Sequence, residues 1–163
     1  MKAKSNSRPQ GSGQKRRTLS GARTAFPVFL IEDGRDLGGS LASMLSAQGL
    51  SVLATASSGP EGLAQVRRLK PKLVLVDAAI GDHGSLTLVR AVRKLSRGVK
   101  VVVMHLPIGH RDIVAFVRAG VSGFIMKDAS PSEFVRTIRL VADGVSVLPD
   151  LITAKLFSHL ASR

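Results

Sequence analysis

The sequence predicts a doubly wound α/β fold, in which helices cover both faces of a five-stranded parallel sheet and an extra helix follows at the C-terminus. Short apolar runs alternate with helical patterns along the chain. The runs are continuously apolar, which is typical of parallel strands covered on both faces. We expect right-handed crossovers and the strand order 2-1-3-4-5 that small folds of this kind adopt. The five predicted strands lie at 28–31, 50–56, 73–76, 99–104 and 123–126.

Helical spacing of apolar residues and capping signals fill the intervals between these runs. Ser58 and Glu61 have the spacing of a capping box, and Pro71 ends the helix that they begin. Ser130 and Glu133 repeat the box, with a proline at the first helical position. Glycines after other helices supply left-handed caps. The five predicted helices lie at 35–48, 58–70, 86–95, 110–119 and 131–143.

A sixth helix is predicted at 150–163, where Asp150 would cap the first turn. Its apolar residues form a broad face, composed of Leu151, Ile152, Leu156, Phe157 and Leu160. Such a face can dock onto the domain, form a dimer contact or lead into a further domain. The sequence leaves these three alternatives open.

The composition fits one domain with appendages, since 163 residues is near the usual domain size and 44% of them are hydrophobic. The absence of cysteine excludes disulfides, thiolate zinc sites and cysteine nucleophiles, and the four histidines lack the spacing of metal ligands. No apolar stretch approaches the ~20 residues that span a bilayer, and the basic N-terminus lacks the apolar segment of a signal peptide. We therefore expect a soluble cytoplasmic protein without a membrane partner.

The N-terminal segment is basic and polar. Residues 1–23 hold seven Lys or Arg and no acid, and all 11 acids of the chain lie at or after Glu32. Too few apolar residues are present to offset the entropy of ordering, so residues 1–25 are predicted to be a disordered tail. The tail is either a solubilising leader or a weak, sequence-independent contact for nucleic acid.

Three of the predicted strands end in charged residues: the first in Glu32 and Asp33, the third in Asp77 and the fifth in Lys127. The carboxyl ends of parallel strands meet at one edge of the sheet, where open α/β sheets bind ligands. Three carboxylates would suit a divalent cation, and Asp77 could then be phosphorylated, with Lys127 held against the phosphoryl oxygens. Alternatively, Asp77 is a solvated loop acid and Lys127 is a structural partner of one of these acids.

In their order and spacing, these motifs resemble the receiver domains of bacterial two-component response regulators. The acidic pair at 32–33, Asp77 and the run Gly-Phe-Ile-Met-Lys-Asp at 123–128 carry the resemblance. It is strongest to the branch whose receivers precede a helix-turn-helix DNA-binding domain. The resemblance implies a flavodoxin-like receiver domain over 26–145, followed by a linker-like helix over 146–163.

The resemblance implies a role for each charged residue. Asp77 would accept a phosphoryl group from a phosphohistidine of a sensor histidine kinase or a phosphotransfer protein. Glu32, Asp33 and Asp77 would hold Mg²⁺, directly or through water. Lys127 would bind a phosphoryl oxygen, and Phe124 would be a rotating aromatic switch, although a strand phenylalanine is more often a core residue. Such a protein is not a conventional enzyme, because it catalyses only its own phosphorylation and dephosphorylation.

The resemblance breaks at the end of the fourth strand. The family has a hydroxyl residue there, which bonds the phosphoryl group and couples it to the following helix, but this chain has His105. Leu106 stands where a small residue usually gives access to the phosphate, and we expect it to crowd that space. His105 could stabilise the site without phosphate, mimic activation, or mark a receiver that is regulated in another way.

Three functions therefore compete. The first is a phosphoacceptor receiver, and the second is a pseudo-receiver that binds a partner whatever its phosphorylation state. The partner, an effector or a second copy of the chain, would use the surface of the fourth helix, fifth strand and fifth helix. Arg118, Arg136 and Arg139 would make this surface basic. The third function is weak binding of nucleic acid by the basic tail.

Overall fold

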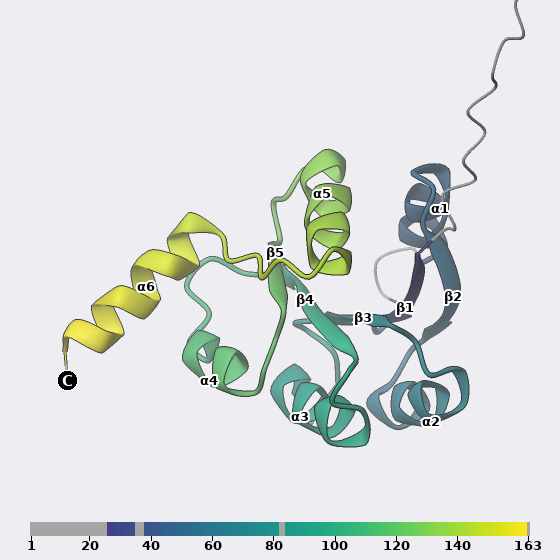
Figure 1. Cartoon of the computed structure of the whole chain (residues 1–163), viewed down its shortest axis with the longest axis horizontal. Helices are drawn as coiled ribbons and strands as arrows, with labels where there is room; N and C mark the ends of the chain where they lie inside the picture. Colours follow the sequence, from purple (N-terminus) through teal and green to yellow (C-terminus); the bar gives the residue numbers. More distant parts are fainter. Residues whose placement is uncertain (1–25, 35–37, 82–83, 163) are drawn as a thin grey trace, which may run out of the picture.

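The computed structural model describes residues 26–34, 38–81 and 84–162 of the chain (Figure 1). The predicted basic tail at 1–25 lies outside these residues. Within them, the strands form one parallel sheet of order β2-β1-β3-β4-β5, which confirms the predicted fold and strand order. The strands are β1 (Pro27–Ile31), β2 (Ser51–Ala56), β3 (Leu73–Asp77), β4 (Lys100–Leu106) and β5 (Gly123–Met126).

The described helices are α1 (Gly38–Ala47), α2 (Gly59–Leu69), α3 (Ser85–Leu95), α4 (Ile113–Arg118), α5 (Pro131–Ala142) and α6 (Asp150–Ala161). In Figure 1, α1 and α5 lie on one face of the sheet, and α2, α3 and α4 lie on the other. α6 runs outward beyond α4 and is the extra helix predicted at the C-terminus. None of the described helices is long and apolar enough to cross a membrane.

The sheet separates two apolar cores, because successive strand residues point to opposite faces. In β1, Phe29 and Ile31 pack on the side of α2, α3 and α4, while Val28 and Leu30 pack on the side of α1 and α5. All four side chains are fully buried. A central strand covered on both faces needs an apolar residue at every position, which explains the continuous runs in the sequence.

The predicted capping box of α5 is confirmed, whereas that of α2 is incomplete. At α5, Ser130 Oγ accepts from the N–H of Glu133 (3.3 Å), and Glu133 Oε2 accepts from the N–H of Ser130 (2.7 Å). At α2, Ser58 Oγ accepts from the N–H of Glu61 (3.3 Å). The carboxylate of Glu61, however, accepts from the N–H of Ser57 (2.9 Å), one residue further back than a capping box requires.

The fourth strand is longer and the fourth helix shorter than predicted. β4 extends to Leu106, and α4 covers only part of the predicted 110–119. Between them, Gly109 has a φ of +90°, and the N–H of His110 donates to the carbonyl of Pro107 (3.2 Å). This turn precedes the predicted helix, and α4 begins only at Ile113, three residues later than predicted.

The segment after α5 covers the free edge of β5. The N–H of Phe124 donates to the carbonyl of Val147 (3.1 Å), and the N–H of Val147 donates to the carbonyl of Ser122 (3.0 Å). A parallel bridge also joins Gly123 and Val147. Because an uncovered edge strand can pair with other chains, this contact protects the sheet.

α6 is docked through part of its apolar face. Ile152 is fully buried in the core on the α4 side, and Leu156 is partly buried against the same core. By contrast, Leu151, Phe157 and Leu160 are 48%, 68% and 67% exposed, so a large part of the predicted apolar face stays in solvent. Of the three predicted alternatives, the structure therefore shows docking of the helix onto the domain.

The predicted cap of α6 at Asp150 is wrong. Pro149 occupies the capping position and Asp150 is the first residue of the helix. No side chain forms a capping hydrogen bond at this end of α6. A carboxylate in the first turn still interacts favourably with the positive end of the helix dipole.

Candidate functional site

The carboxyl ends of the strands converge on a pocket of about 380 Å³. Asp77 is the last residue of β3, while Asp33 follows β1 and Lys127 follows β5. These three residues were predicted to meet at one edge of the sheet, and all of them line the pocket, together with His105. The pocket lies where the strand order changes direction between β1 and β3, which is the usual ligand site of open α/β sheets.

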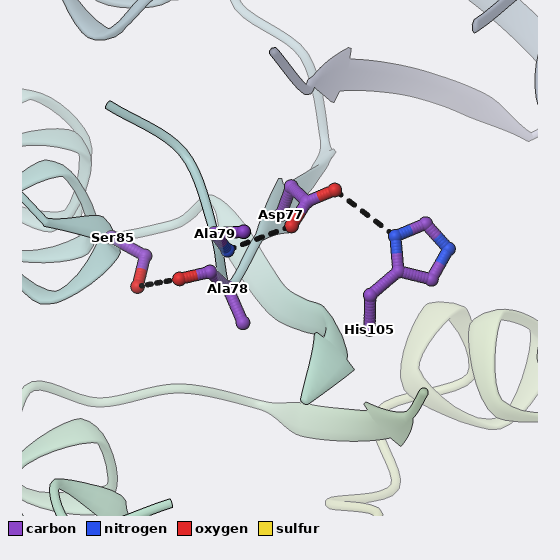
Figure 2. Close-up of polar contacts among 5 residues, drawn as sticks. All are labelled: Asp77, Ala78, Ala79, Ser85 and His105. Carbon is purple, nitrogen blue, oxygen red and sulfur yellow. Dashed lines mark hydrogen bonds and ion pairs between the residues drawn. The ribbon is translucent and has the colours of Figure 1, made fainter. Parts of the chain in front are cut away.

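Both carboxylate oxygens of Asp77 are engaged by the protein (Figure 2). Oδ1 accepts a hydrogen bond from the backbone N–H of Ala79 (2.7 Å), and Oδ2 lies 3.0 Å from Nδ1 of His105. An ionised carboxylate only accepts hydrogen bonds, so Nδ1 of His105 carries the hydrogen and donates it. Asp77 is only 6% exposed, and these contacts therefore replace much of its hydration.

Two hydrogen bonds of Ala78 hold the loop that follows Asp77. The N–H of Ala78 donates to the carbonyl of Met104 (2.9 Å). The carbonyl of Ala78 accepts from Ser85 Oγ (3.0 Å) at the start of α3, as Figure 2 shows. Ser85 is itself buried. This anchoring keeps the N–H of Ala79 directed at Asp77.

A bulge in β4 places His105 beside Asp77. Val103 of β4 pairs with Phe124 of β5, and Leu106 pairs with Met126. Between these two pairs, two residues of β4 therefore lie opposite a single residue of β5. His105 is the second of these two β4 residues, and its φ of +54° lies in the left-handed region that favours glycine. Bulges of this kind re-aim a side chain and are common next to active sites.

The prediction that Leu106 crowds the pocket is wrong. Without the bulge, alternation would send residue 105 into the core on the α4 side and Leu106 to the opposite face. The extra residue reverses this, so Leu106 is fully buried in the same core as Phe116 of α4. His105 instead lies against the ring of Phe134 on α5, with centroids 6.0 Å apart, and lines the pocket.

The acids predicted as metal ligands differ in their surroundings. Asp33 is half-buried and lines the pocket with Asp77. Glu32 is only 5% exposed, and its backbone N–H donates to the carbonyl of Ala56 in β2 (3.0 Å). Among residues 26–34, 38–81 and 84–162, no three His, Cys, Asp or Glu side chains come close enough together to hold a metal ion. The ligand set of Glu32, Asp33 and Asp77 therefore stays a prediction.

Lys127 lines the pocket from the end of β5. Its backbone N–H donates to the carbonyl of Leu106 (3.0 Å), which fixes it beside the bulge. Its side chain is exposed and forms no ion pair with an acid in the part of the chain that the structure describes. The ammonium group can therefore meet an anionic ligand in the pocket.

Phe124 lies in the core rather than in this pocket. It is fully buried, and it meets the ring of Phe116 edge-on, with centroids 6.0 Å apart and an interplanar angle of 81°. These are the surroundings of a core residue. The role of Phe124 as a rotating switch stays a prediction.

Two groups of the pocket were not predicted. The first is the backbone N–H of Ala79, which leaves no trace in a side-chain pattern. The second is His110, whose Nδ1 accepts from the N–H of Asp112 (3.2 Å) and whose ring packs against Phe116 at 5.6 Å. The sequence did contain a signal for His110, since this residue follows the fourth strand at the same edge of the sheet as the charged strand ends.

The surface of α4, β5 and α5 is less open and less basic than predicted. The segment around Val147 covers the edge of β5, and α6 packs beside α4. Arg139 faces the other way, since its Nη2 donates to the carbonyl of Gln48 (2.6 Å) just after α1. Of the three predicted arginines, Arg118 and Arg136 are left to make this surface basic, and both are exposed.

A comparison with protein families matches residues 28–139 to the response regulator receiver domain. The match spans the five strands except for Pro27, the first residue of β1, and it includes every residue that lines the pocket. The chain belongs to this family. The resemblance predicted from the sequence is thereby confirmed.

The receiver is similar to curated response regulators over most of its length. It is 26% identical over 137 residues to the nitrate/nitrite response regulator protein NarL of Escherichia coli (strain K12), which covers 83% of this chain and 63% of NarL. It is 24% identical over 140 residues to the response regulator protein VraR of Staphylococcus epidermidis (strain ATCC 12228 / FDA PCI 1200), which covers 85% of this chain and 67% of VraR. The chain thus spans about two thirds of the length of these relatives.

Solved structures share the fold. A two-component response regulator of the LuxR family from Aurantimonas sp. SI85-9A1 has a TM-score of 0.74 at 18% identity, over 84% of this chain and 99% of that one. The isolated REC domain of RcsB from Salmonella enterica serovar Typhimurium, in the presence of phosphomimetic BeF3-, has a TM-score of 0.68 at 12% identity, over 80% and 97%. At these identities the similarity shows the receiver fold alone.

Proposed function

We propose that this receiver accepts a phosphoryl group on Asp77 from a phosphohistidine, with the assistance of Mg²⁺. The placement of Asp77 carries the proposal. Its carboxylate ends a central strand and shares a pocket at the switch point of the sheet with Asp33 and Lys127. Membership of the receiver family supports the same reaction.

Mg²⁺ fits the chemistry of the donors in the pocket. The ion prefers carboxylate oxygens, often takes only one or two of them, and completes its shell with water and phosphate oxygens. Asp33 and Asp77 supply such oxygens, and the neighbouring Glu32 would contribute directly or through water. When bound, the ion would neutralise negative charge on the phosphoryl group.

The groups of the chain would act by position and by charge. An oxygen of Asp77 forms a bond to phosphorus while the P–N bond of the phosphohistidine breaks, and the electron pair of that bond returns to the donor imidazole. The N–H of Ala79, which already points at Asp77, and the ammonium of Lys127 would stabilise the phosphoryl oxygens. The protein would promote its own phosphorylation and dephosphorylation and act on no other substrate.

The phosphoryl donor would be a sensor histidine kinase or a phosphotransfer protein. Its phosphohistidine has to approach the carboxyl edge of the sheet, because the pocket with Asp77 lies there. Since the residues that carry the chemistry come from separate strands, the fold has to be intact for the transfer to occur.

Phosphorylation by acetyl phosphate, followed by intact-mass spectrometry, tests the proposal. We expect the wild type to gain one phosphoryl group only when Mg²⁺ is present, and Asp77→Asn to gain none, because an amide is a poor nucleophile. Asp143→Asn is a matched control, since Asp143 is exposed and lies at the far end of α5. It should be labelled like the wild type. A wild type that stays unlabelled, or a labelled Asp77→Asn, would contradict the proposal.

The bond between His105 and Asp77 favours a second candidate function, a pseudo-receiver that binds a protein partner in either state. His105 engages an oxygen that phosphorylation requires. If a partner binds the wild type, Asp77→Asn and Asp77→Glu with equal affinity, this second function is favoured. A partner that distinguishes phosphorylated from unphosphorylated protein favours the first.

A further inference from the structure

His105 adopts a backbone conformation that is unfavourable for a residue with a side chain. Its φ of +54° lies in the left-handed region, where Cβ crowds the backbone and which glycine and asparagine tolerate best. The surroundings hold the residue there, because the next residue, Leu106, is fully buried and its carbonyl accepts from the N–H of Lys127 (3.0 Å). Residues held in strained conformations by their surroundings cluster at functional sites.

The imidazole of His105 is fixed from two sides. Nδ1 lies 3.0 Å from Oδ2 of Asp77, and the ring lies against that of Phe134 at an interplanar angle of 52°. The side chains of His105 and Asp77 are 25% and 9% exposed. A hydrogen bond to an ionised group, largely shielded from water, is stronger than an exposed one.

This hydrogen bond competes with phosphorylation for the same oxygen. The N–H of Ala79 holds Oδ1 of Asp77, and His105 holds Oδ2. Phosphoryl transfer needs one carboxylate oxygen as the nucleophile, while Mg²⁺ would bind the other. A donated hydrogen bond lowers the electron density available on Oδ2, and the imidazole occupies space beside it. Oδ2 is therefore a poorer ligand and a poorer nucleophile while His105 holds it.

We infer that His105 is a positioning residue that latches Asp77 in its unphosphorylated state, and that this latch opens when Mg²⁺ and the phosphoryl group bind. The inference rests on the proposed function. The P–N bond of the donor breaks, the P–O bond to Asp77 forms, and the electron pair stays with the donor imidazole. His105 forms and breaks no covalent bond in this step, and it only gives up Oδ2 as its hydrogen-bond partner.

Two variants separate the latch from the backbone strain. His105→Gly removes the imidazole and suits a φ of +54°. His105→Asn also tolerates this φ and keeps a short side chain with an N–H donor for Oδ2. Both are compared with the wild type in the rate of Mg²⁺-dependent labelling by acetyl phosphate. The dissociation constant for Mg²⁺ is measured by calorimetry without a phosphoryl donor, and thermal unfolding shows that each variant is folded.

We expect His105→Gly to be labelled about tenfold faster than the wild type and to bind Mg²⁺ about tenfold more tightly, which corresponds to the loss of one competing hydrogen bond. His105→Asn should fall between the two, since it retains a donor. A role in the fold alone would change the thermal transition and leave the affinity for Mg²⁺ unaltered.

The outcomes distinguish the latch from the proposed function. If His105→Gly is folded but is labelled no faster and binds Mg²⁺ no more tightly, the latch is overturned and phosphorylation of Asp77 stands. If neither the wild type nor the variants are labelled, the proposed function fails. The dissociation constant for Mg²⁺ then tests whether His105 restrains Asp77, because an unchanged constant in His105→Gly would overturn the latch. If His105→Gly does not fold, the same two measurements are made on His105→Asn. A labelling rate and a dissociation constant for Mg²⁺ equal to those of the wild type would then overturn the latch.

Discussion

Glu133 accepts hydrogen bonds from the hydroxyl of Ser130 (2.7 Å) and from its backbone N–H (2.7 Å) at the start of α5. These contacts hold the pKa of Glu133 below its usual value of 4.5, and the hydrogen bond from the hydroxyl of Ser130 has the largest effect, followed by the bond from its N–H. Burial raises the pKa, and the positive charge of Arg136 lowers it further. Because the folded pKa is lower than the unfolded one, ionised Glu133 stabilises the fold above about pH 4.5. This contribution is lost as the pH falls through the folded pKa.

Glu133→Gln should therefore lower the free energy of unfolding at neutral pH. The effect is small, since the group is exposed and screened by solvent. The difference between wild type and variant should vanish as the pH falls below 4.5. Urea unfolding at a series of pH values measures it, and a difference that does not change with pH would show that the ionised form has no special partner.

The sequence predicted the position of the charged residues better than their contacts. Asp33, Asp77 and Lys127 follow apolar runs, and strand ends are local features that a single segment reveals. The orientation of His105 depends on the register between β4 and β5, and a shift of one residue reverses the face of every following side chain. No local pattern could reveal that shift.

The bulge in β4 makes Leu106 a core residue, which stability measurements can test. Leu106→Ala should lower the free energy of unfolding by about 2–4 kcal/mol, because it removes a fully buried side chain. The labelling rate of the folded protein should not change. Leu95→Ala is the control, since Leu95 is 37% exposed and its loss should cost about 1 kcal/mol or less.

Urea unfolding and labelling of the same two variants give the answer. If Leu106→Ala were as stable as the wild type and labelled faster, Leu106 would line the pocket, as the sequence predicted. That result would also mean that β4 continues without the bulge at His105.

Among the elements, strands were predicted more accurately than the ends of helices. Continuous apolar runs mark buried parallel strands, and the fifth strand was predicted with its observed bounds. The apolar spacing at 110–119 is helical, but a turn closed by the carbonyl of Pro107 and the left-handed Gly109 delays α4. Turns of this kind depend on the strand that precedes them, and the predicted strand ended too early.

Ile152 is the buried residue that packs α6 against the rest of the molecule. Ile152→Ala should lower the free energy of unfolding by about 2–4 kcal/mol, because Ile152 is fully buried in the core shared with α4. Leu160→Ala, at a site that is 67% exposed, should leave stability within about 0.5 kcal/mol of the wild type. Equal stability of the two variants in urea would mean that α6 is not docked in solution.

At the scale of the whole molecule, the alternation of strands and helices predicted the parallel sheet, and the order typical of small folds of this kind supplied the strand order, which the structure confirms. The covering of the β5 edge by Val147 was not foreseen, because a single bridge has no periodicity to detect. This contact and α6 occupy part of the surface that was predicted for a partner. The proposed chemistry, in contrast, is placed at the carboxyl edge of the sheet, where Asp77 lines the pocket.

The identity of the phosphorylated residue is measured most directly by reducing the labelled protein with borohydride, which converts an aspartyl phosphate into homoserine. Peptide mass spectrometry then locates the converted residue. After incubation with acetyl phosphate and Mg²⁺, we expect homoserine in place of Asp77, and unchanged aspartate when Mg²⁺ is omitted. Homoserine in place of another acid, such as Asp33, or no conversion anywhere in the chain, would contradict phosphorylation at Asp77.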